Sequence, residues 1–353
     1  MMKKIATIVG ARPQFVKVAV IRRLLHEDSD INEVLIHTGQ HFDHNMSDIF
    51  FEELEIPKPQ YDLDIAGGGH GQMTGRMMEA LETVLVDESP DAVLVYGDTN
   101  STLAGALTAA KLHIPIVHVE AGLRSFNRRM PEEINRLVTD HLSAQLFCPT
   151  RTSVENLQRE SIEAGVHMIG DVMHDATLFA KDRAAEHSDI LDQLSLEDDH
   201  YGLCTMHRAE NTDDPARFED ICRFIEAEAA NKPIVFPVHP RTRQILDKAG
   251  RTLKGVKCIE PVGYFDMHRL LSGASILLTD SGGLQKEAYF HRTPCITLRD
   301  ETEWVETLES GWNRLWQGGE YVEPRGKISD YGDGDAGEKI VSAVRTFLAD
   351  TAD

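Results

Sequence analysis

Short apolar, β-favouring runs alternate with helical patterns along the whole chain, which is typical of parallel sheets with crossover helices. The runs that we expect to form buried strands are Lys4–Val9, Glu33–His37, Ala92–Tyr96, Ile116–Val119, Leu146–Cys148, His167–Ile169, Tyr201–Thr205, Ile234–Val238, Val256–Ile259, Ser275–Leu278 and Cys295–Leu298. Helices are predicted over Pro13–His26, Thr102–Lys111, Glu132–His141, Pro215–Glu228 and Gly283–Phe290. The pattern indicates an α/β protein.

The alternation breaks near Gly170–Asp171, before a charged segment, Asp182–Asp199, that we expect to be a surface helix and linker. A chain of 353 residues is also too long for one ordinary core. We therefore expect two doubly wound domains, residues 1–170 and 171–336. Ligands of such sheets bind at the carboxyl ends of the strands, so the residues directly after strands are the informative ones.

Composition removes several classes of function. A net charge of -22 argues against nucleic acid or an anionic membrane as a partner. No run of 18 apolar residues exists, and the apolar stretch Ile5–Val9 is too short for a signal peptide, so we expect a cytoplasmic protein. Five cysteines lie without any C-x-x-C pair and are expected to be small buried hydrophobic residues.

Basic residues follow the first predicted strand. That strand ends in Gly10-Ala11-Arg12-Pro13, and Lys17 comes one helical turn later. The pattern is not the dinucleotide fingerprint G-x-G-x-x-G. Two cations at a helix N-terminus still suit a diphosphate, whereas the alternative is a tight turn with solvated cations.

Three carboxylates stand at strand ends or a helix start in the first half. Asp98 follows one strand and could cap the next helix, whereas Glu120 follows another and could pair with Arg124. Glu132 lies in the first turn of a predicted helix, where its charge suits the dipole. Convergent carboxylates can supply general acids and bases, so chemistry and structure both remain open explanations.

In the second half, polar residues again follow strands. These are His207, His239 and the run Ser281-Gly282-Gly283. Serine and glycines at a helix start can present backbone N–H groups to a phosphate without a side chain in the way. Three polar strand ends on one sheet edge indicate a ligand there.

We assign no catalytic or binding role to two other features of the sequence. His37, His41 and His44 lie close together, but no matched acids follow and Thr38-Gly39 interrupts any helix face, so we expect no metal site. The glycine-rich segment Ala66–Gly71 is predicted to be a flexible loop.

In order and spacing, the motifs resemble the non-hydrolysing UDP-N-acetylglucosamine 2-epimerases over nearly the whole chain. The matching stretches are Gly10-Ala11-Arg12-Pro13 with Lys17, Gly97-Asp98-Thr99-x-Ser101, His118-Val119-Glu120-Ala121-Gly122-Leu123-Arg124, Pro131-Glu132-Glu133-Ile134-Asn135-Arg136, His207-Arg208-x-Glu210-Asn211, Pro237-Val238-His239-Pro240 and Asp280-Ser281-Gly282-Gly283-Leu284-Gln285.

The resemblance implies two Rossmann-like domains facing a central cleft, the GT-B type, with residues 337–353 forming a helix that packs back on the first domain. It implies conversion of UDP-N-acetylglucosamine to UDP-N-acetylmannosamine by elimination of UDP to a 2-acetamidoglucal and re-addition. Neither a redox cofactor nor a metal is then needed. It also implies a homodimer.

Site residues are carried over from the resemblance. The implied acid and base candidates are Asp98, Glu120 and Glu132, assisted by His207, and which carboxylate takes the proton stays open. The residues implied to bind UDP are Arg12, Lys17, His239, Phe265 near the uracil, Ser281, Gly282, Gly283 and Glu287.

Several positions depart from the family pattern. Residues 125–130 are shorter and more basic, Trp304 replaces an arginine, Ala209 replaces another, and Asp43 stands where allosteric members carry glutamine. These departures resemble the branch acting on UDP-2,3-diacetamido-glucuronate, with Arg128 and Arg129 facing the sugar carboxylate.

Three competing functions share parts of this pattern. A hydrolysing 2-epimerase would share nearly every motif and release the free sugar. A GT-B glycosyltransferase would share the UDP site but need an acceptor groove rather than three acids. A non-catalytic nucleotide-sugar sensor would be expected to lose the acids, which are all present.

Overall fold

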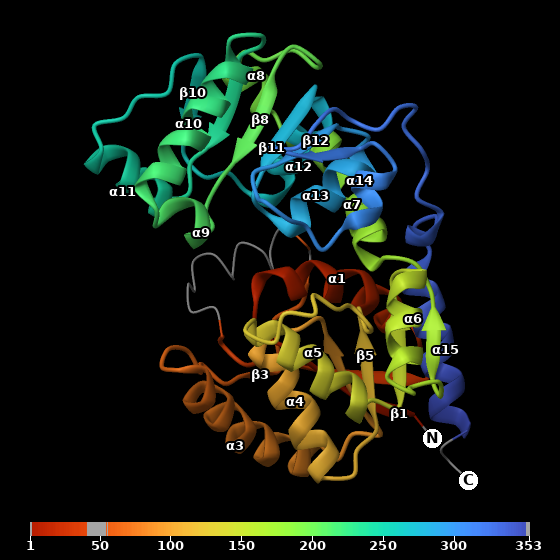
Figure 1. Cartoon of the computed structure of the whole chain (residues 1–353). Coiled ribbons are helices and arrows are strands. Elements are labelled where there is room, and N and C mark those ends of the chain that lie inside the picture. Colours follow the sequence, from red (N-terminus) through yellow and green to blue (C-terminus); the bar gives the residue numbers. More distant parts are fainter. Residues whose placement is uncertain (1, 41–53, 55, 351–353) are drawn as a thin grey trace. The chain divides into compact units, whose positions relative to one another are not determined.

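The computed structural model describes residues 2–40, 54 and 56–350 of the chain. These residues form two compact units (Figure 1): unit 1 comprises residues 1–176 with 329–353, and unit 2 comprises residues 177–328. Each unit is built on one parallel β-sheet. Among the described helices, none combines the length and apolarity needed to cross a bilayer.

The sheet of unit 1 has seven parallel strands in the order β3-β2-β1-β4-β5-β6-β7. Their bounds are β1 (Lys3–Val9), β2 (Ile31–His37), β3 (Tyr61–Asp62), β4 (Ala92–Tyr96), β5 (Ile116–Val119), β6 (Gln145–Cys148) and β7 (Val166–Met168). In the centre, Thr7 of β1 pairs with Leu35 on one side and Leu94 on the other. The central strands are almost wholly apolar because helices cover both faces of a parallel sheet.

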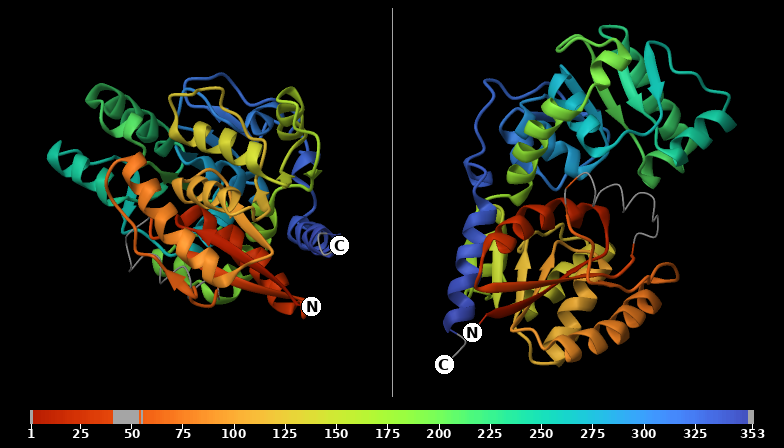
Figure 2. Two further views of the ribbon diagram at one scale, coloured as in Figure 1. Left: turned by 90° about the horizontal axis from the view of Figure 1, so that it is seen from below. Right: turned by 180° about the vertical axis from the view of Figure 1, so that it is seen from behind.

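The helices of unit 1 form two layers, which the two views of Figure 2 also show. Their bounds are α1 (Arg12–Glu27), α3 (His70–Glu88), α4 (Asn100–Lys111), α5 (Pro131–Leu142), α6 (Arg151–Arg159), α7 (Val172–His187), which runs on into unit 2, and α15 (Ala336–Asp350), preceded by the 3-10 helix η1 (Ser329–Tyr331). Helix α4 packs between α3 and α5, whereas α15 packs on α1. The strand order reverses between β1 and β4, which makes that pair the topological switch point.

Two glycines allow close packing in unit 1. A Cβ on Gly105 of α4 would lie 2.9 Å from Cδ1 of Ile8, so α4 sits directly on β1. A Cβ on Gly337 would lie 2.8 Å from Cγ1 of Val20, which brings α15 equally close to α1. The carboxylate of Asp175 accepts the N–H groups of Ala336 (3.3 Å) and Gly337 (2.9 Å) and so caps α15.

Unit 2 repeats the architecture with six parallel strands in the order β10-β9-β8-β11-β12-β13. The strands are β8 (Gly202–Thr205), β9 (Ile234–Pro237), β10 (Val256–Ile259), β11 (Ile276–Thr279), β12 (Cys295–Thr297) and β13 (Asn313–Leu315). The helices are α8 (Ile190–Leu194), α9 (Ala209–Thr212), α10 (Pro215–Ala229), α11 (Pro240–Lys248), α12 (Tyr264–Gly273), α13 (Gly282–His291) and α14 (Val305–Glu309). Its switch point lies between β8 and β11.

The expectation of two parallel α/β domains is confirmed, and every predicted strand is present within two residues of its predicted bounds. The strands β3 and β13 were not predicted, because Tyr61–Asp62 and Asn313–Leu315 contain no apolar run. The loop expected over Ala66–Gly71 is wrong for its last two residues, since His70 and Gly71 open the 19-residue helix α3. The charged segment Asp182–Asp199 contains the end of α7 and the short α8.

Candidate active site

The carboxyl ends of β1, β4 and β5 bring an acid and a cation together in unit 1. Lys17 on α1 forms an ion pair with Glu120, and the two side chains are only 8% and 11% exposed. Glu120 has a left-handed backbone, with φ 71°, and Gly97 beside it has φ 60°. A Cβ at Gly97 would stand 3.2 Å from Oε2 of Glu120. A backbone conformation that L-residues rarely adopt therefore holds Glu120 against Lys17, as is common at functional sites.

Asp98 follows β4 and is held from α5. Arg136 Nη1 donates to Asp98 Oδ2 at 2.6 Å, and the side-chain amide of Asn135 donates to the backbone carbonyl of Asp98 at 2.8 Å. Desolvation raises the pKa of Asp98, and the charges of Glu120 and Glu132 raise it further; Arg136 and Lys17 oppose this only in part. Asp98 is thus poised to take up and release a proton nearer neutrality than an ordinary aspartate.

Asp98 does not cap the following helix. The N-cap of α4 is Thr99, whose hydroxyl accepts the N–H of Thr102. The structural explanation that the sequence offered for Asp98 is therefore wrong. Glu132 lies exposed in the first turn of α5.

Arg124 does not pair with Glu120, so that expectation is also wrong. Its guanidinium donates to Asp140 at 2.7 Å and to both oxygens of Glu160 at 2.8 Å. The fully buried Asp140 contacts Nδ1 of His118 at 2.7 Å, and His118 Nε2 lies 2.8 Å from the carbonyl oxygen of Gly97. This buried network holds the Gly97-Asp98 turn in place through the contact of His118 with the carbonyl oxygen of Gly97. Sequence reasoning missed Asp140 because the buried side of α5 consists of polar residues, whereas Ile134 is exposed, so hydrophobic periodicity does not mark that side.

The corresponding edge of unit 2 is organised by Asp280, which follows β11 and is fully buried. Its carboxylate accepts the N–H groups of His207 and Arg208, both at 2.9 Å, and the amide of Asn211 at 3.1 Å. Burial alone would raise the pKa of Asp280, but its bonds with His207 and these N–H groups outweigh burial and hold the pKa below its usual value. Asp280 thereby joins the ends of β8 and β11 across the switch point.

His207 projects from this frame with its side chain 43% exposed, and its Nδ1 lies 3.2 Å from Asp280. The ring of His239 is 5.7 Å from that of His207, and its side chain accepts the N–H of Arg241 at the start of α11. The two histidines therefore stand side by side at the ends of β8 and β9. Because the buried carboxylate of Asp280 holds its Nδ1, the imidazole of His207 has a defined orientation.

Helix α13 begins directly after Ser281, at Gly282. A Cβ on Gly283 would meet no atom within 4 Å, whereas one on Gly282 would stand 2.4 Å from Oε1 of Glu303. The first N–H groups of a helix have no partner within it, and the open side at Gly283 leaves them an approach for an anion. Such a helix start suits an anion such as a diphosphate.

The remaining predicted residues are distributed over both units. Glu287 is 9% exposed on α13, and the ring of Phe265 on α12 lies 6.4 Å from that of Phe179. The side chain of Arg12 lies outside the described part of the structure, as do His41, Asp43 and His44.

His37 pairs with Asp62 at 3.2 Å, and the described residues contain no group of three side chains suited to a metal. All five cysteines have free thiols, four of them buried.

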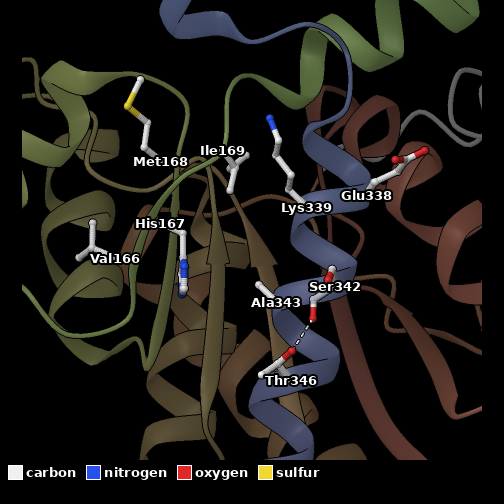
Figure 3. A pocket seen from close by; sticks show the side chains of 9 residues that line it. All are labelled: Val166, His167, Met168, Ile169, Glu338, Lys339, Ser342, Ala343 and Thr346. Atoms are coloured by element: carbon white, nitrogen blue, oxygen red, sulfur yellow. Dashed lines mark hydrogen bonds between the residues drawn. The ribbon is translucent and has the colours of Figure 1, made fainter.

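Figure 3 shows a pocket of about 680 Å³ in unit 1, away from these residues. It lies between the edge strand β7 and helix α15. Its lining residues are Val166, His167, Met168, Ile169, Glu338, Lys339, Ser342, Ala343 and Thr346. Because none of them belongs to the sets described above, the strand ends remain the candidate site.

Known proteins resemble the chain over most of its length. A family model described as UDP-N-acetylglucosamine 2-epimerase matches residues 23–345. The UDP-2,3-diacetamido-2,3-dideoxy-D-glucuronate 2-epimerase of Pseudomonas aeruginosa is 54% identical over 316 residues, covering 88% of each chain. The UDP-N-acetylglucosamine 2-epimerase of Methanocaldococcus jannaschii is 44% identical over 98% of this chain and 92% of its own.

Solved structures show the same fold. A crystal structure of the Methanocaldococcus jannaschii enzyme in complex with UDP-GlcNAc and UDP superposes with a TM-score of 0.86, at 43% identity, over 97% of this chain and 99% of that one. The enzyme of Neisseria meningitidis bound to UDP-GlcNAc also gives 0.86, at 32% identity, over 97% and 100%. The GT-B type of fold is thereby confirmed. The family model matches most of the chain, and relatives at 44% and 54% identity cover at least 88% of it, so the chain belongs to the UDP-N-acetylglucosamine 2-epimerase family.

Proposed function

We propose that this epimerase inverts carbon 2 of a UDP-linked 2-acetamido sugar by elimination and re-addition of UDP. The observation that carries the proposal is the acid cluster of unit 1, in which Asp98 has a raised pKa beside Glu120 and Glu132. Carboxylates in unlike environments can divide the roles of acid and base between them. Lys17 compensates the charge of Glu120, whereas the pKa of Asp98 stays raised although Arg136 contacts its carboxylate.

The reaction balances without an external reagent. A carboxylate removes the proton from C2, the former C2–H electron pair forms the C1=C2 double bond, and the C1–O bond breaks so that UDP leaves with its electron pair. The proton then returns to the other face of C2, and the UDP oxygen attacks C1. Asp98 and Glu120 are our first candidates for the two proton transfers, and Glu132 is a third candidate. No metal or redox cofactor takes part in this reaction scheme.

Unit 2 is proposed to hold UDP. Gly282 and Gly283 offer backbone N–H donors for the diphosphate and Ser281 offers its hydroxyl, because the N–H of Ser281 already donates to Thr279 Oγ1 at 3.0 Å. His207 and His239 stand beside the same switch point. Preorganised donors stabilise the charge that develops on a leaving diphosphate without reorganising during the reaction. Glu287 is proposed to accept the ribose hydroxyls, Phe265 to contact the uracil, and Arg12 with Lys17 to approach the diphosphate from unit 1. The proposal thus assigns proton transfer to unit 1 and most of the UDP contacts to unit 2, in a homodimeric cytoplasmic enzyme.

Two sugars are candidates. Relatives at 44% and 45% identity are named for UDP-N-acetylglucosamine, whereas the relative at 54% is named for the diacetamido-glucuronate. Proton NMR of each UDP-sugar with the protein in heavy water tests the proposal. Formation of the manno epimer with deuterium at C2 supports it. Release of a free sugar with UDP would favour a hydrolysing epimerase, and no deuterium at C2 of either sugar would overturn the proposal.

A further inference from the structure

A basic turn, residues 125–130, connects β5 to α5 and is shaped by the buried Glu133. Oε2 of Glu133 accepts the N–H and the hydroxyl of Ser125, at 2.8 and 2.9 Å, and Oε1 accepts the N–H of Phe126 at 2.9 Å. Within the turn, Asn127 Oδ1 accepts the N–H of Arg129 at 3.1 Å, and its carbonyl accepts that of Met130 at 3.0 Å. The basic turn therefore presents its side chains from a hydrogen-bonded backbone, which lowers the entropy lost on binding.

The basic turn is linked to Asp98 through a single guanidinium. Arg136 donates to Oε2 of Glu133 from Nη2 at 2.8 Å and from Nε at 3.2 Å, and to Asp98 from Nη1. Burial alone would raise the pKa of Glu133, but the bonds from Ser125 and Arg136 outweigh burial and keep the pKa low, so Glu133 remains a charged anchor. Glu133 and Arg136 thus connect the first residues of the basic turn to the candidate proton carrier.

The neighbouring cations are already committed to carboxylates. Lys17 pairs with Glu120, Arg136 with Asp98 and Glu133, and Arg124 with Asp140 and Glu160. By contrast, Arg128 and Arg129 are both exposed, and neither guanidinium has a hydrogen-bond or ion-pair partner within the described structure. The chain has a net charge of -22, and yet the positive charges of these two adjacent arginines near the acid cluster are not compensated by any carboxylate of the described structure.

A uronate would bring one more negative charge to a site that already contains three carboxylates. At close range such repulsion is substantial unless cations compensate it. Guanidinium groups match the planar carboxylate and can bind it through two parallel hydrogen bonds. We propose that Arg128 and Arg129 bind the sugar carboxylate of a UDP-linked uronate and make the enzyme select it over a neutral hexose. This inference rests on the proposed function and adds the substrate class.

The test uses two ligands that differ only at C6, UDP-2,3-diacetamido-2,3-dideoxyglucuronate and UDP-2,3-diacetamido-2,3-dideoxyglucose. Equilibrium binding and kcat/KM are measured for both with wild type, the double variant Arg128→Ala/Arg129→Ala and the conservative Arg128→Lys/Arg129→Lys. Arg159→Ala on α6 is the control, because it also removes one exposed positive charge from unit 1. Binding is measured even where turnover fails, so failure of the epimerase proposal is distinguished from failure of this one.

We expect wild type to prefer the uronate, and the double alanine variant to lose about 100-fold for the uronate and less than about 3-fold for the neutral sugar, since two charge-assisted hydrogen bonds are removed. The lysine variant should fall between them, because it keeps the charge and loses the paired geometry. Equal affinity of wild type for both sugars would overturn the inference. So would an unchanged preference in the double variant, or an equal loss in Arg159→Ala.

Discussion

Asp98 and Asp280 occupy the same topological position in the two sheets and yet have opposite electrostatics. Each follows the strand on the far side of the switch point, β4 in unit 1 and β11 in unit 2. Asp280 receives two backbone N–H groups and an amide, and its pKa is lowered. Asp98 receives one guanidinium and faces two other carboxylates, and its pKa is raised. The fold supplies the position, whereas the donors around it decide between proton transfer and structural support.

The largest effect is expected from Glu120→Gln, which tests whether the unit 1 edge is the chemical one. Activity should fall about 100- to 10,000-fold because a proton-transfer group is removed. The buried Lys17 is also left without its partner, so stability will fall as well. The double variant Lys17→Met/Glu120→Gln should recover stability without recovering activity. Recovery of turnover in the double variant would show that the ion pair is only structural.

Asp280→Ala tests the other half of the comparison. It removes one acceptor from two part-buried backbone N–H groups and from the buried amide of Asn211, and we expect a loss of about 3–5 kcal/mol in the free energy of unfolding and weaker binding of UDP. Denaturant titration and calorimetric binding of UDP would measure both. If UDP affinity stays unchanged in the folded variant, Asp280 does not organise the nucleotide site.

Asp175 sharpens the comparison because it receives two backbone N–H groups and still has its pKa raised to about 6, chiefly by burial. An aspartate whose pKa is higher in the folded than in the unfolded state contributes stability below pH 4 and loses it as pH rises through 6. Between pH 5 and 7.5 this loss is about 1 kcal/mol. Asp175→Asn should remove that part of the pH dependence, measured by denaturation at both values. An identical pH dependence in both proteins would contradict the assignment.

The smallest effect concerns Arg136, whose charge opposes the rise of the Asp98 pKa. In Arg136→Met the pKa of Asp98 should rise further, so the limb of the kcat/KM profile that reports Asp98 should move about one pH unit upward. Arg136→Lys keeps the charge and should leave the limb nearly in place. A limb that does not move in either variant would show that it reports another group.

Much of this arrangement was predictable from the sequence, but not the pairing of the charges. The strands and the polar residues after them follow from apolar runs and from the rule that ligands bind at strand ends. Partners were not predictable: Arg124 contacts Asp140 and Glu160 rather than Glu120, and Glu133 rather than Glu132 is buried. These contacts depend on the buried side of α5, which hydrophobic periodicity does not mark because its residues are polar, and on the left-handed backbone at Glu120, which no local pattern reveals.

Asp98→Asn tests the central claim most directly, namely that proton transfer belongs to unit 1 and nucleotide binding to unit 2. Deuterium incorporation at C2 of the UDP-sugar in heavy water and calorimetric binding of UDP are measured on the same preparation. We predict that exchange falls about 100-fold or more while the Kd for UDP stays within about 3-fold of wild type. Exchange at the wild-type rate, or loss of UDP affinity in parallel with exchange, would contradict the account.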